Sequence, residues 1–478
     1  MLIDSHAHLN DRQFDGDLDA VLERAKKEGV EIIIVPGSNV ASSEKAVDLA
    51  DRYEEVYACA GIHPHETGEA EDGDLQKISE LLKAKKVVAV GEIGLDFHYD
   101  FSPREIQRIY FRRQLDLAAE ANLPVVIHSR ESNSEVLAEI ASAVERHPMW
   151  RQDVGKSASG GHNRYPRARG VLHSFSGTVA EAWEAIKLGF LISIPGWITF
   201  KKSPAAELVR SIPVEHLLIE TDAPYLAPVP YRGRRNEPAF LRYTAEAIAA
   251  LQGLSVEDVA RATWYNARHL FPLSAGQVQL GGSDVPEIAY KIRNSLYLNI
   301  TLRCNADCIF CDRKGDAVIK GHNLKIDREP TVEEIITAIG DPSRYDEVVF
   351  CGYGEPTIRF DVVKEVARWL KSKGVKVRLN TDGHGNIINH RNIVPELVGL
   401  VDAVSISLNS ADPQQYGRLM QINPDIYFPA MVEFARECVR LIPEVIMTVV
   451  AMDGVDVERA RKFVEEELGA QFRDRPYF

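Results

Sequence analysis

Between residue 1 and about residue 272, short apolar segments alternate with amphipathic ones, and this alternation limits the possible fold more than any other feature. It predicts helices between strands, for example over 103–121, with a mostly apolar stripe of Ile106, Ile109, Tyr110, Leu115, Leu117 and Ala118. Eight strand–helix units predict a (β/α)8 barrel of the TIM type. The alternative, an open doubly wound sheet, lacks its usual Gly-x-Gly-x-x-Gly turn after the first strand. The strands are expected near 2–6, 31–35, 56–62, 86–92, 124–128, 170–174, 190–194 and 217–221.

The length and composition of the chain narrow its class. A chain of 478 residues is too long for one ordinary core, so two or three domains are expected. The sequence shows neither a basic-then-apolar leader nor an apolar run of bilayer length, which predicts a cytoplasmic protein without membrane contact. The formal net charge of -14 argues against sequence-independent coating of nucleic acid, yet it allows a nucleic-acid enzyme with a local basic rim and bound cations.

Six polar residues come at or directly after the predicted strands of this half. His6 and His8 are two residues apart, so on an extended chain their imidazoles point the same way. The carboxyl ends of parallel strands meet at one face of a barrel, so the side chains that end four other strands belong at the same place: Glu92, His128, His173 and Asp222. One histidine after an apolar run is more often an ordinary core or loop residue. Metal-competent side chains at five strand ends predict a metal site instead.

Four histidines and two carboxylates are enough ligands for two cations. Glu92 could bridge the two ions, and this mixture of nitrogen and oxygen ligands suits zinc, manganese, magnesium or similar divalent ions. Paired cations activate water and hold the attacking and leaving oxygens of a displacement. Asp222 could hold a metal and also take a proton from that water, so we expect Asp222 and Glu92 to be catalytic.

Several short motifs strengthen this interpretation, because their order along the chain resembles that of the TatD family of metal-dependent deoxyribonucleases. The resemblance covers roughly 1–272 and implies that the six residues above are metal ligands. It also implies hydrolysis of phosphodiesters, usually from DNA ends, with DNA or another nucleic acid as substrate. One departure is the segment 147–169, which looks like an insertion. The motifs are Asp4-Ser5-His6-Ala7-His8, Gly61-Ile62-His63-Pro64-His65, Gly91-Glu92-Ile93-Gly94-Leu95-Asp96, His128-Ser129-Arg130, His173-Ser174-Phe175-Ser176-Gly177, Glu220-Thr221-Asp222-Ala223-Pro224-Tyr225 and Arg232-Gly233-Arg234-Arg235-Asn236-Glu237-Pro238.

Two further sets of residues are weaker candidates. His63 and His65 could meet a phosphate near the metals, although both also suit an ordinary polar loop. Guanidinium groups suit phosphates, so the same choice between a phosphate site and a solvated loop applies to Arg130, Arg232, Arg234 and Arg235. Because barrels host many chemistries, a metal-dependent amidase or another small-molecule hydrolase is the alternative for this half.

The character of the chain changes after a predicted linker over 273–290, whose residues 274–284 are rich in glycine and serine. Cys304, Cys308 and Cys311 then follow a predicted strand with the spacing Cys-x3-Cys-x2-Cys. Three thiolates in one short loop predict a metal or a cluster. Zinc would need a fourth protein ligand, and no second cysteine pair is present, but a zinc-binding interaction module stays the alternative for this half.

The three-cysteine motif closely resembles the signature of the radical S-adenosylmethionine (SAM) superfamily. The resemblance implies a [4Fe–4S] cluster, SAM, a 5′-deoxyadenosyl radical and an electron donor such as flavodoxin or ferredoxin. Gly352, Gly354 and Glu355 stand in a stretch similar to the superfamily's GGEP segment, which meets the amino group of SAM. Strands near 295–301, 348–351, 375–380, 402–407, 444–449 and 470–474 fit a partial (β/α)6 barrel over 291–478. Residues at strand ends could meet the ribose or the carboxylate, or serve as ordinary turn and cap residues: Asn380, Ser405, Ser407 and Asn409.

Overall fold

The computed structural model describes residues 1–148, 150, 168–273 and 285–476. Most of the predicted insertion over 147–169 and of the predicted linker over 273–290 lies outside these residues. The chain divides into two compact units, an N-terminal one and a C-terminal one, each with its own sheet. In the part of the chain that is described, no helix is both long and apolar enough to cross a membrane.

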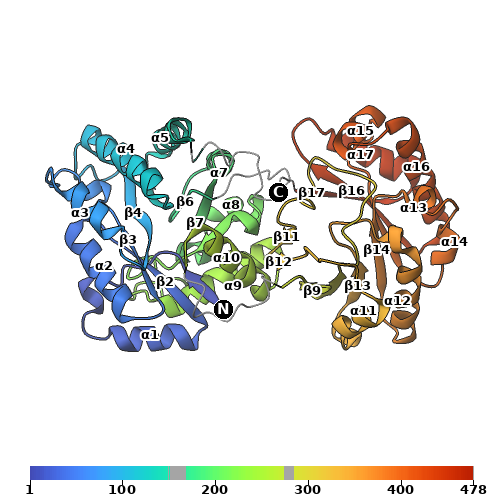
Figure 1. Cartoon of the computed structure of the whole chain (residues 1–478), viewed down its shortest axis with the longest axis horizontal. Helices are drawn as coiled ribbons and strands as arrows, with labels where there is room; N and C mark the ends of the chain where they lie inside the picture. The colour runs from blue at the N-terminus through green and yellow to red at the C-terminus, as the bar shows by residue number, and fades with distance from the viewer. Residues whose placement is uncertain (149, 151–167, 274–284, 477–478) are drawn as a thin grey trace. The chain divides into compact units, whose positions relative to one another are not determined.

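The N-terminal unit is a barrel of eight parallel strands in sequential order, which confirms the predicted (β/α)8 fold (Figure 1). The last strand meets the first where Ser5 N–H donates a hydrogen bond to Ile219 O at 3.1 Å and Asp222 N–H donates to His6 O at 2.9 Å. All eight strands lie close to their predicted places. They are β1 (Leu2–Asp4), β2 (Val30–Pro36), β3 (Val56–Ala60), β4 (Val87–Asp96), β5 (Val125–Arg130), β6 (Gly170–Leu172), β7 (Phe190–Ile194) and β8 (Leu217–Ile219).

Helices surround this barrel. Several begin with a capping box, in which the residue before the helix and the residue three positions later each accept a hydrogen bond from the other's backbone N–H group. Thr178 and Glu181 form such a box at α7, and Ser255 and Asp258 form one at α10. The helices are α1 (Leu18–Lys27), α2 (Val40–Arg52), α3 (Asp74–Leu81), α4 (Arg104–Ala121), α5 (Asn133–Arg146), α7 (Val179–Lys187), α8 (Ala205–Ser211), α9 (Leu241–Gln252) and α10 (Val256–Leu270).

Side chains alternate between two apolar clusters along the barrel strands. On β2, Ile33 and Val35 pack in the cluster between the sheet and the helices, whereas Ile32 and Ile34 belong to a second cluster that includes Trp264 of α10. The second cluster therefore fills the barrel interior, and α10 covers one end of it. One sequence expectation was wrong here: Ile109, placed in the apolar stripe of α4, is 47% exposed.

The C-terminal unit contains a seven-stranded sheet in the order β17-β16-β15-β14-β13-β10-β9. Six of these strands run parallel and β9 pairs antiparallel to β10 at the edge, which confirms the predicted partial (β/α)6 barrel. The strands are β9 (Ala289–Ile292), β10 (Ser295–Leu298), β13 (Glu347–Phe350), β14 (Val377–Thr381), β15 (Ala403–Ser407), β16 (Glu444–Ala451) and β17 (Gln471–Pro476), with a small hairpin of β11 (Val318–Ile319) and β12 (His322–Asn323).

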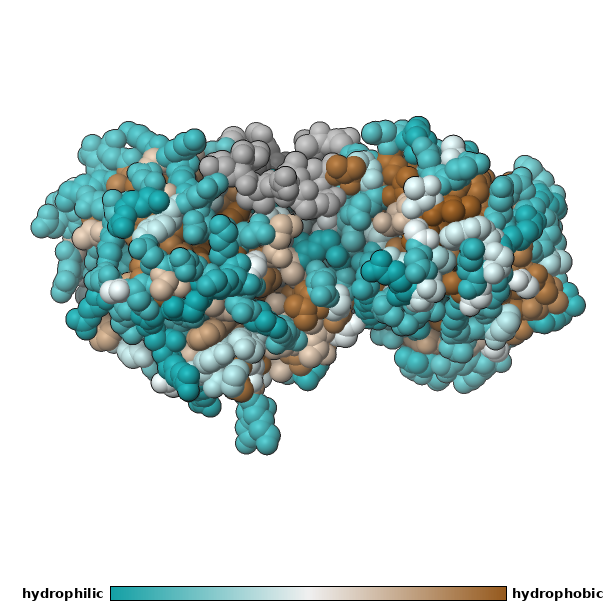
Figure 2. Space-filling model, turned by 90° about the horizontal axis from the view of Figure 1, so that it is seen from below, coloured by the Kyte–Doolittle hydropathy of each residue, from teal (hydrophilic) through white to brown (hydrophobic). Residues whose placement is uncertain are grey.

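The helices of the C-terminal unit pack on one face of its sheet. Leu379 of β14 lies in the core they share, whereas Arg378 and Asn380 alternate with it and so belong to the opposite, more polar face. The surface view in Figure 2 is mostly hydrophilic over both units, with hydrophobic residues in smaller patches. The helices are α11 (Val332–Ile339), α12 (Phe360–Ser372), α13 (Gly385–Ile388), α14 (Val394–Leu397), α15 (Pro413–Met420), α16 (Pro424–Leu441) and α17 (Val457–Lys462).

Candidate metal centre and cysteine site

His6 and His8 lie just beyond β1, at the carboxyl end of the barrel strands. Their Nε2 atoms are 3.2 Å apart, so the two imidazoles meet at one point as the sequence predicts. The Nε2 atoms of His6 and His8 lie 3.9 Å and 3.5 Å from Asp222 Oδ1, respectively. A parallel bridge between Ala7 and Ala223 holds the two segments together. The closure of the barrel therefore brings these three side chains to one place.

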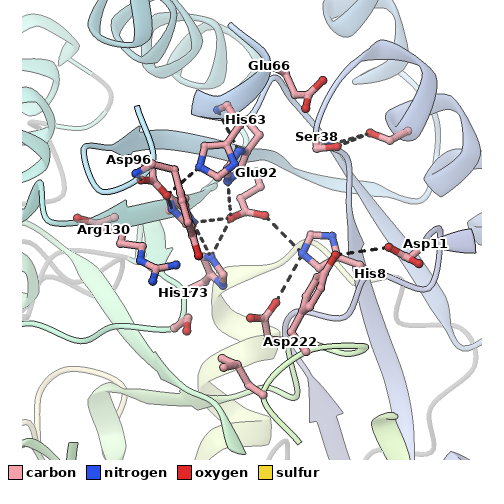
Figure 3. Close-up of a pocket in the computed structure, with 18 of the residues that line it drawn as sticks. His8, Asp11, Ser38, His63, Glu66, Glu92, Asp96, Arg130, His173 and Asp222 are labelled. Atoms are coloured by element: carbon pink, nitrogen blue, oxygen red, sulfur yellow. Dashed lines mark hydrogen bonds and ion pairs between the residues drawn. The ribbon is translucent and has the colours of Figure 1, made fainter. Parts of the chain in front are cut away.

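Glu92 is the centre of the cluster (Figure 3). Its Oε1 lies 2.8 Å from His173 Nε2, 3.0 Å from His128 Nδ1 and 3.5 Å from His63 Nε2. Its Oε2 lies 3.3 Å from His6 Nε2 and 3.7 Å from His8 Nε2. The four predicted histidine ligands thus gather around the carboxylate of Glu92, His63 joins them, and Asp222 meets His6 and His8.

The charges of this cluster depend on one another. Burial opposes ionisation of Glu92, but the imidazoles of His173, His63 and His6 outweigh it and hold the pKa of the carboxyl well below its usual range. Burial also lowers the pKa of His173, but the carboxylates of Glu92 and Glu220 outweigh burial and raise the pKa of His173 well above its usual value. The carboxylate of Glu92 and the imidazole of His173 therefore favour each other's charged forms.

Asp96 at the end of β4 orients two of the imidazoles. Its Oδ2 lies 3.0 Å from His128 Nε2 and 2.8 Å from His65 Nε2, so Asp96 holds the ring of His128 from the side opposite to Glu92. Gly94 lets this part of β4 lie close to β5, because a Cβ at Gly94 would be 2.0 Å from His128 O and its φ is 143°. A carboxylate behind a metal-ligating histidine typically fixes its tautomer.

The cluster lies in a cavity of about 870 Å³. Among the four arginines that the sequence suggested for phosphate binding, Arg130 lines this cavity. Arg235 is paired with Asp17 at 2.7 Å instead, and Arg232 lies over the Phe200 ring, 4.5 Å from its centroid. Neither of these two, nor Arg234, is among the residues that line the cavity.

The three cysteines of the C-terminal unit lie in the loop after β10, which docks on the end of α15. Asp307 N–H donates to Met420 O at 3.0 Å, and Cys308 Sγ lies 3.3 Å from Met420 Sδ. Cys304, Cys308 and Cys311 are partly buried free thiols. Burial raises the pKa of Cys304 to about 12, with a smaller contribution from the carboxylate of Asp382.

The segment 352–356 lies against this loop. A Cβ on Gly354 would be 2.2 Å from Thr301 O, so the close approach needs glycine. The buried carboxylate of Glu355 accepts hydrogen bonds from Thr357 Oγ1 at 2.6 Å and from Thr381 Oγ1 at 2.9 Å. Burial, followed by the charge of Asp382, raises the pKa of Glu355 to about 8. In this structure, Glu355 thus joins the ends of β13 and β14.

The predicted strand-end residues of this unit lie on the polar face of the sheet. Asn380 and Ser405 are register partners on β14 and β15, and Ser407 follows two residues later on the same face. The buried Oδ1 atoms of Asn380 and Asn409 have no hydrogen-bond partner among the described residues, and the same holds for Asn299 Oδ1. Buried acceptors usually have partners, so these orphaned atoms beside the cysteine loop fit a polar cofactor.

Comparison with known proteins matches each half of the chain to a protein family. The family model described as TatD related DNase matches residues 3–272, more than half of the chain. The chain belongs to the TatD related DNase family. A second family model, that of the radical SAM superfamily, matches residues 298–466, so the chain also carries a radical SAM domain. Both domains are enzymatic: the first is a metal-dependent hydrolase of nuclease type, and the second is a radical SAM enzyme.

The relatives of the TatD barrel span 57% of this chain. The uncharacterized metal-dependent hydrolase YabD of Bacillus subtilis is 41% identical over 276 residues, which make up 100% of that protein. A 3'-5' ssDNA/RNA exonuclease TatD of Pantoea ananatis is 34% identical over 279 residues, again 100% of the relative. The crystal structure of YJJV, a TatD homolog of Escherichia coli, is 31% identical, with a TM-score of 0.51 and 98% of that chain covered.

The donor atoms of the TatD barrel fit divalent metal ions. Three groups of three residues each bring three donor atoms, one from each residue, within 4.8 Å of one another. The donors are imidazole nitrogens and carboxylate oxygens, and none is a thiolate. His6 Nδ1 and Glu220 Oε2 are buried and make no hydrogen bond with a described residue. The groups are His6, His8 and Asp222; His6, His173 and Glu220; and His63, Glu92 and His128.

Sequence reasoning did not assign roles to Asp96 and Glu220 at this site. Both stand in motifs that were noted, with Asp96 ending the stretch that begins at Gly91. The available signal for Glu220 was its spacing of two residues from Asp222, since alternate residues of a strand share a face. The carboxylate of Glu220 lies 3.5 Å from His173 Nδ1 and accepts a hydrogen bond from Ser174 N–H at 2.6 Å.

Proposed function

We propose that the TatD barrel hydrolyses phosphodiester bonds of nucleic acid, removing nucleotides from an end. The observation that carries this proposal is the gathering of imidazoles and carboxylates around Glu92 in a cavity of about 870 Å³. Curated relatives that align over their whole length are named single-stranded DNA/RNA exonucleases, which supports an end-directed activity on the same scaffold.

We assign the ligands of two divalent ions, zinc, manganese or magnesium, to the residues that meet at Glu92. Such ions activate water and neutralise charge on phosphate oxygens. Glu92 is placed between the two groups of imidazoles, because each of its oxygens faces a different group. Asp222 lies beside His8 and would accept a proton from the attacking water. The ligands are His6, His8, Glu92, His128, His173 and Asp222.

Hydrolysis assays on matched substrates test this function. Protein loaded with each metal in turn is expected to shorten an end-labelled single-stranded oligonucleotide stepwise, and the Glu92→Gln variant to be inactive. Amide substrates are expected to stay intact. If the loaded protein cleaves amides and leaves oligonucleotides whole, the barrel is a small-molecule amidase and the nuclease proposal is wrong.

For the C-terminal domain, which we place at 291–478 behind a linker at 273–290, we propose generation of a 5′-deoxyadenosyl radical. Cys304, Cys308 and Cys311 would hold a [4Fe–4S] cluster, which supplies an electron for the cleavage of SAM. Segment 352–355 would face the amino group of SAM, and Asn380, Ser405 and Ser407 its ribose or carboxylate. A flavodoxin or ferredoxin is the expected electron donor.

Anaerobic purification followed by iron and sulfide analysis tests this second activity. About four irons and four sulfides per chain are expected, together with 5′-deoxyadenosine when SAM and a reductant are added. Stoichiometric zinc without sulfide would instead show that the cysteines serve a zinc-binding interaction module.

A further inference from the structure

Exposed aromatic side chains are rare in this protein and are found together. Among the described phenylalanine, tyrosine and tryptophan residues, only Tyr99, Phe101 and Tyr225 are exposed, by 48%, 68% and 52%. Tyr99 and Tyr225 line the metal cavity of the barrel, and Phe101 stacks on Tyr99. Aromatic rings left in water beside a polar site indicate a contact surface, because burying them is favourable.

Tyr99 and Phe101 form an ordered stack, which we call the aromatic shelf. Their ring planes differ by 2° and their centroids lie 5.3 Å apart. The Arg130 guanidinium lies 4.6 Å from the centroid of the Tyr99 ring, and the His65 ring meets Phe101 edge-on at 4.8 Å. The high exposure of Phe101 leaves ring surface on which the stack can continue.

The shelf is fixed to the metal cluster rather than held by a loose loop. The backbone N–H groups of His98 and Tyr99 donate to Asp96 Oδ1 at 3.0 Å and 2.9 Å. The other oxygen of Asp96 faces His128, a proposed metal ligand. On the far side of the loop, Ser102 Oγ donates to His65 O at 2.7 Å. One carboxylate thus contacts both the backbone that carries the shelf and a proposed metal ligand.

We propose that the aromatic shelf stacks an unpaired nucleobase of a DNA or RNA strand, while the cation of Arg130 neutralises a nearby phosphate. Arg130 is exposed, lines the cavity and has no carboxylate partner among the described residues, so its charge is available. Every base has a π face, so stacking tolerates sequence while requiring an unstacked base. A base inside a duplex has both faces covered, and the shelf therefore selects single-stranded ends. This inference rests on the proposed nuclease function.

An abasic substrate tests the shelf directly. We compare two end-labelled single-stranded oligonucleotides that differ only in whether the nucleotides at the cleaved end carry bases. The wild-type protein is expected to have about tenfold higher kcat/KM on the strand with bases, because stacking one base typically contributes this much. Phe101→Leu keeps an apolar side chain without a π face and should bring the two substrates within about twofold. Phe101→Trp should restore the preference.

A matched control and a second readout separate the possible outcomes. Ile109→Leu changes an exposed apolar residue on α4 that is not among the cavity-lining residues and should keep the wild-type preference. Fluorescence of a terminal 2-aminopurine, in a strand with hydrolysis-resistant phosphorothioate ends, should be quenched by wild-type protein and much less by Phe101→Leu. Equal rates on both substrates in wild-type protein, or an unchanged preference in Phe101→Leu, would overturn the shelf alone. A metal-loaded wild-type protein that cleaves neither strand would overturn the nuclease function and the shelf with it.

Discussion

Thr221 and Asp4 join the last strand of the TatD barrel to the first. Thr221 N–H donates to Asp4 Oδ1 at 2.9 Å, and Thr221 Oγ1 donates to Asp4 Oδ2 at 2.5 Å. Both residues are buried, and they lie 217 positions apart in the sequence. His6 comes two residues after Asp4, and Asp222 directly follows Thr221. The junction therefore sets where two proposed metal ligands leave the sheet.

Removing the hydroxyl at this junction should weaken both folding and metal binding. Thr221→Val keeps the side-chain shape but leaves Asp4 Oδ2 buried without that donor, which costs about 1–3 kcal/mol. Urea unfolding and metal titration would measure the two effects. Thr263→Val is a matched control, because the hydroxyl of this buried threonine bonds, among the residues described, to carbonyls of its own helix alone. Equal losses in both variants would contradict a special role for the junction.

Asp96→Asn should lower metal affinity without preventing folding. The carboxylate faces His65 and His128 with Oδ2 and accepts the backbone N–H groups of His98 and Tyr99 with Oδ1, so an amide would turn its NH2 group, which cannot accept, toward one of the two pairs. Loss of such a carboxylate behind a ligand typically costs about 10–100-fold in affinity. Metal titration would show the change, and hydrolysis should recover at high metal concentration. Asp116→Asn, which removes a carboxylate paired with Arg146 on the outside of the barrel, should bind metal normally.

Glu92→Ala should abolish hydrolysis and release at least one ion per chain. This carboxylate is the shared neighbour of the imidazoles on both sides, and its removal leaves the positive charges of two ions facing each other without compensation. Elemental analysis and oligonucleotide hydrolysis would be measured on the same preparation, with circular dichroism as the check on folding. Retention of full metal content and activity would show that Glu92 does not bridge.

The architecture of both domains could be predicted from local sequence patterns. The period of the apolar segments places the strands of the barrel, and the polar residue that follows each strand identifies its functional face. Asp222 shows this well, because the end of an apolar strand and the rule for barrel active sites together locate it.

Features that depend on distant partners could not be predicted in this way. Arg235 looked like a phosphate ligand, yet it pairs with Asp17, 218 residues away in sequence, which neutralises it. Ile109 fits the period of α4 but lies at the edge of the buried stripe, where no element of the described part of the chain covers it. The orienting role of Asp96 depends on the ring of His65, which follows β3, and on the ring of His128 in β5. Local periodicity contains no information on such pairings.

The buried His216 should make the stability of the barrel depend on pH. Burial lowers its pKa to about 4, whereas an unfolded histidine titrates near 6.5. Between these values the unfolded state binds more protons, so the free energy of unfolding falls as pH decreases, by up to about 3 kcal/mol.

Replacing this imidazole should remove that dependence. Relative to wild type, His216→Leu should gain stability as pH is lowered from 6.5 to 4. Urea unfolding monitored by tryptophan fluorescence would measure this gain in stability. Four of the five tryptophans lie in the barrel: Trp150, Trp183, Trp197 and Trp264. His269→Leu, on the exposed side of α10, serves as the control. A wild-type minus variant difference that stays constant over this range would contradict the prediction.

The two activities should be separable by mutation. Each ligand set lies wholly within one domain, each domain has its own apolar core, and the ions they need differ. Allosteric coupling requires a contact whose energy changes with the state of the other site. Cys308→Ala should therefore lose iron, sulfide and 5′-deoxyadenosine formation while keeping nuclease activity near wild type, and Glu92→Ala should do the reverse. Both variants would be assayed for both reactions in anaerobic, metal-replete buffer. Loss of nuclease activity in a folded, cluster-free protein would show that the two domains are coupled.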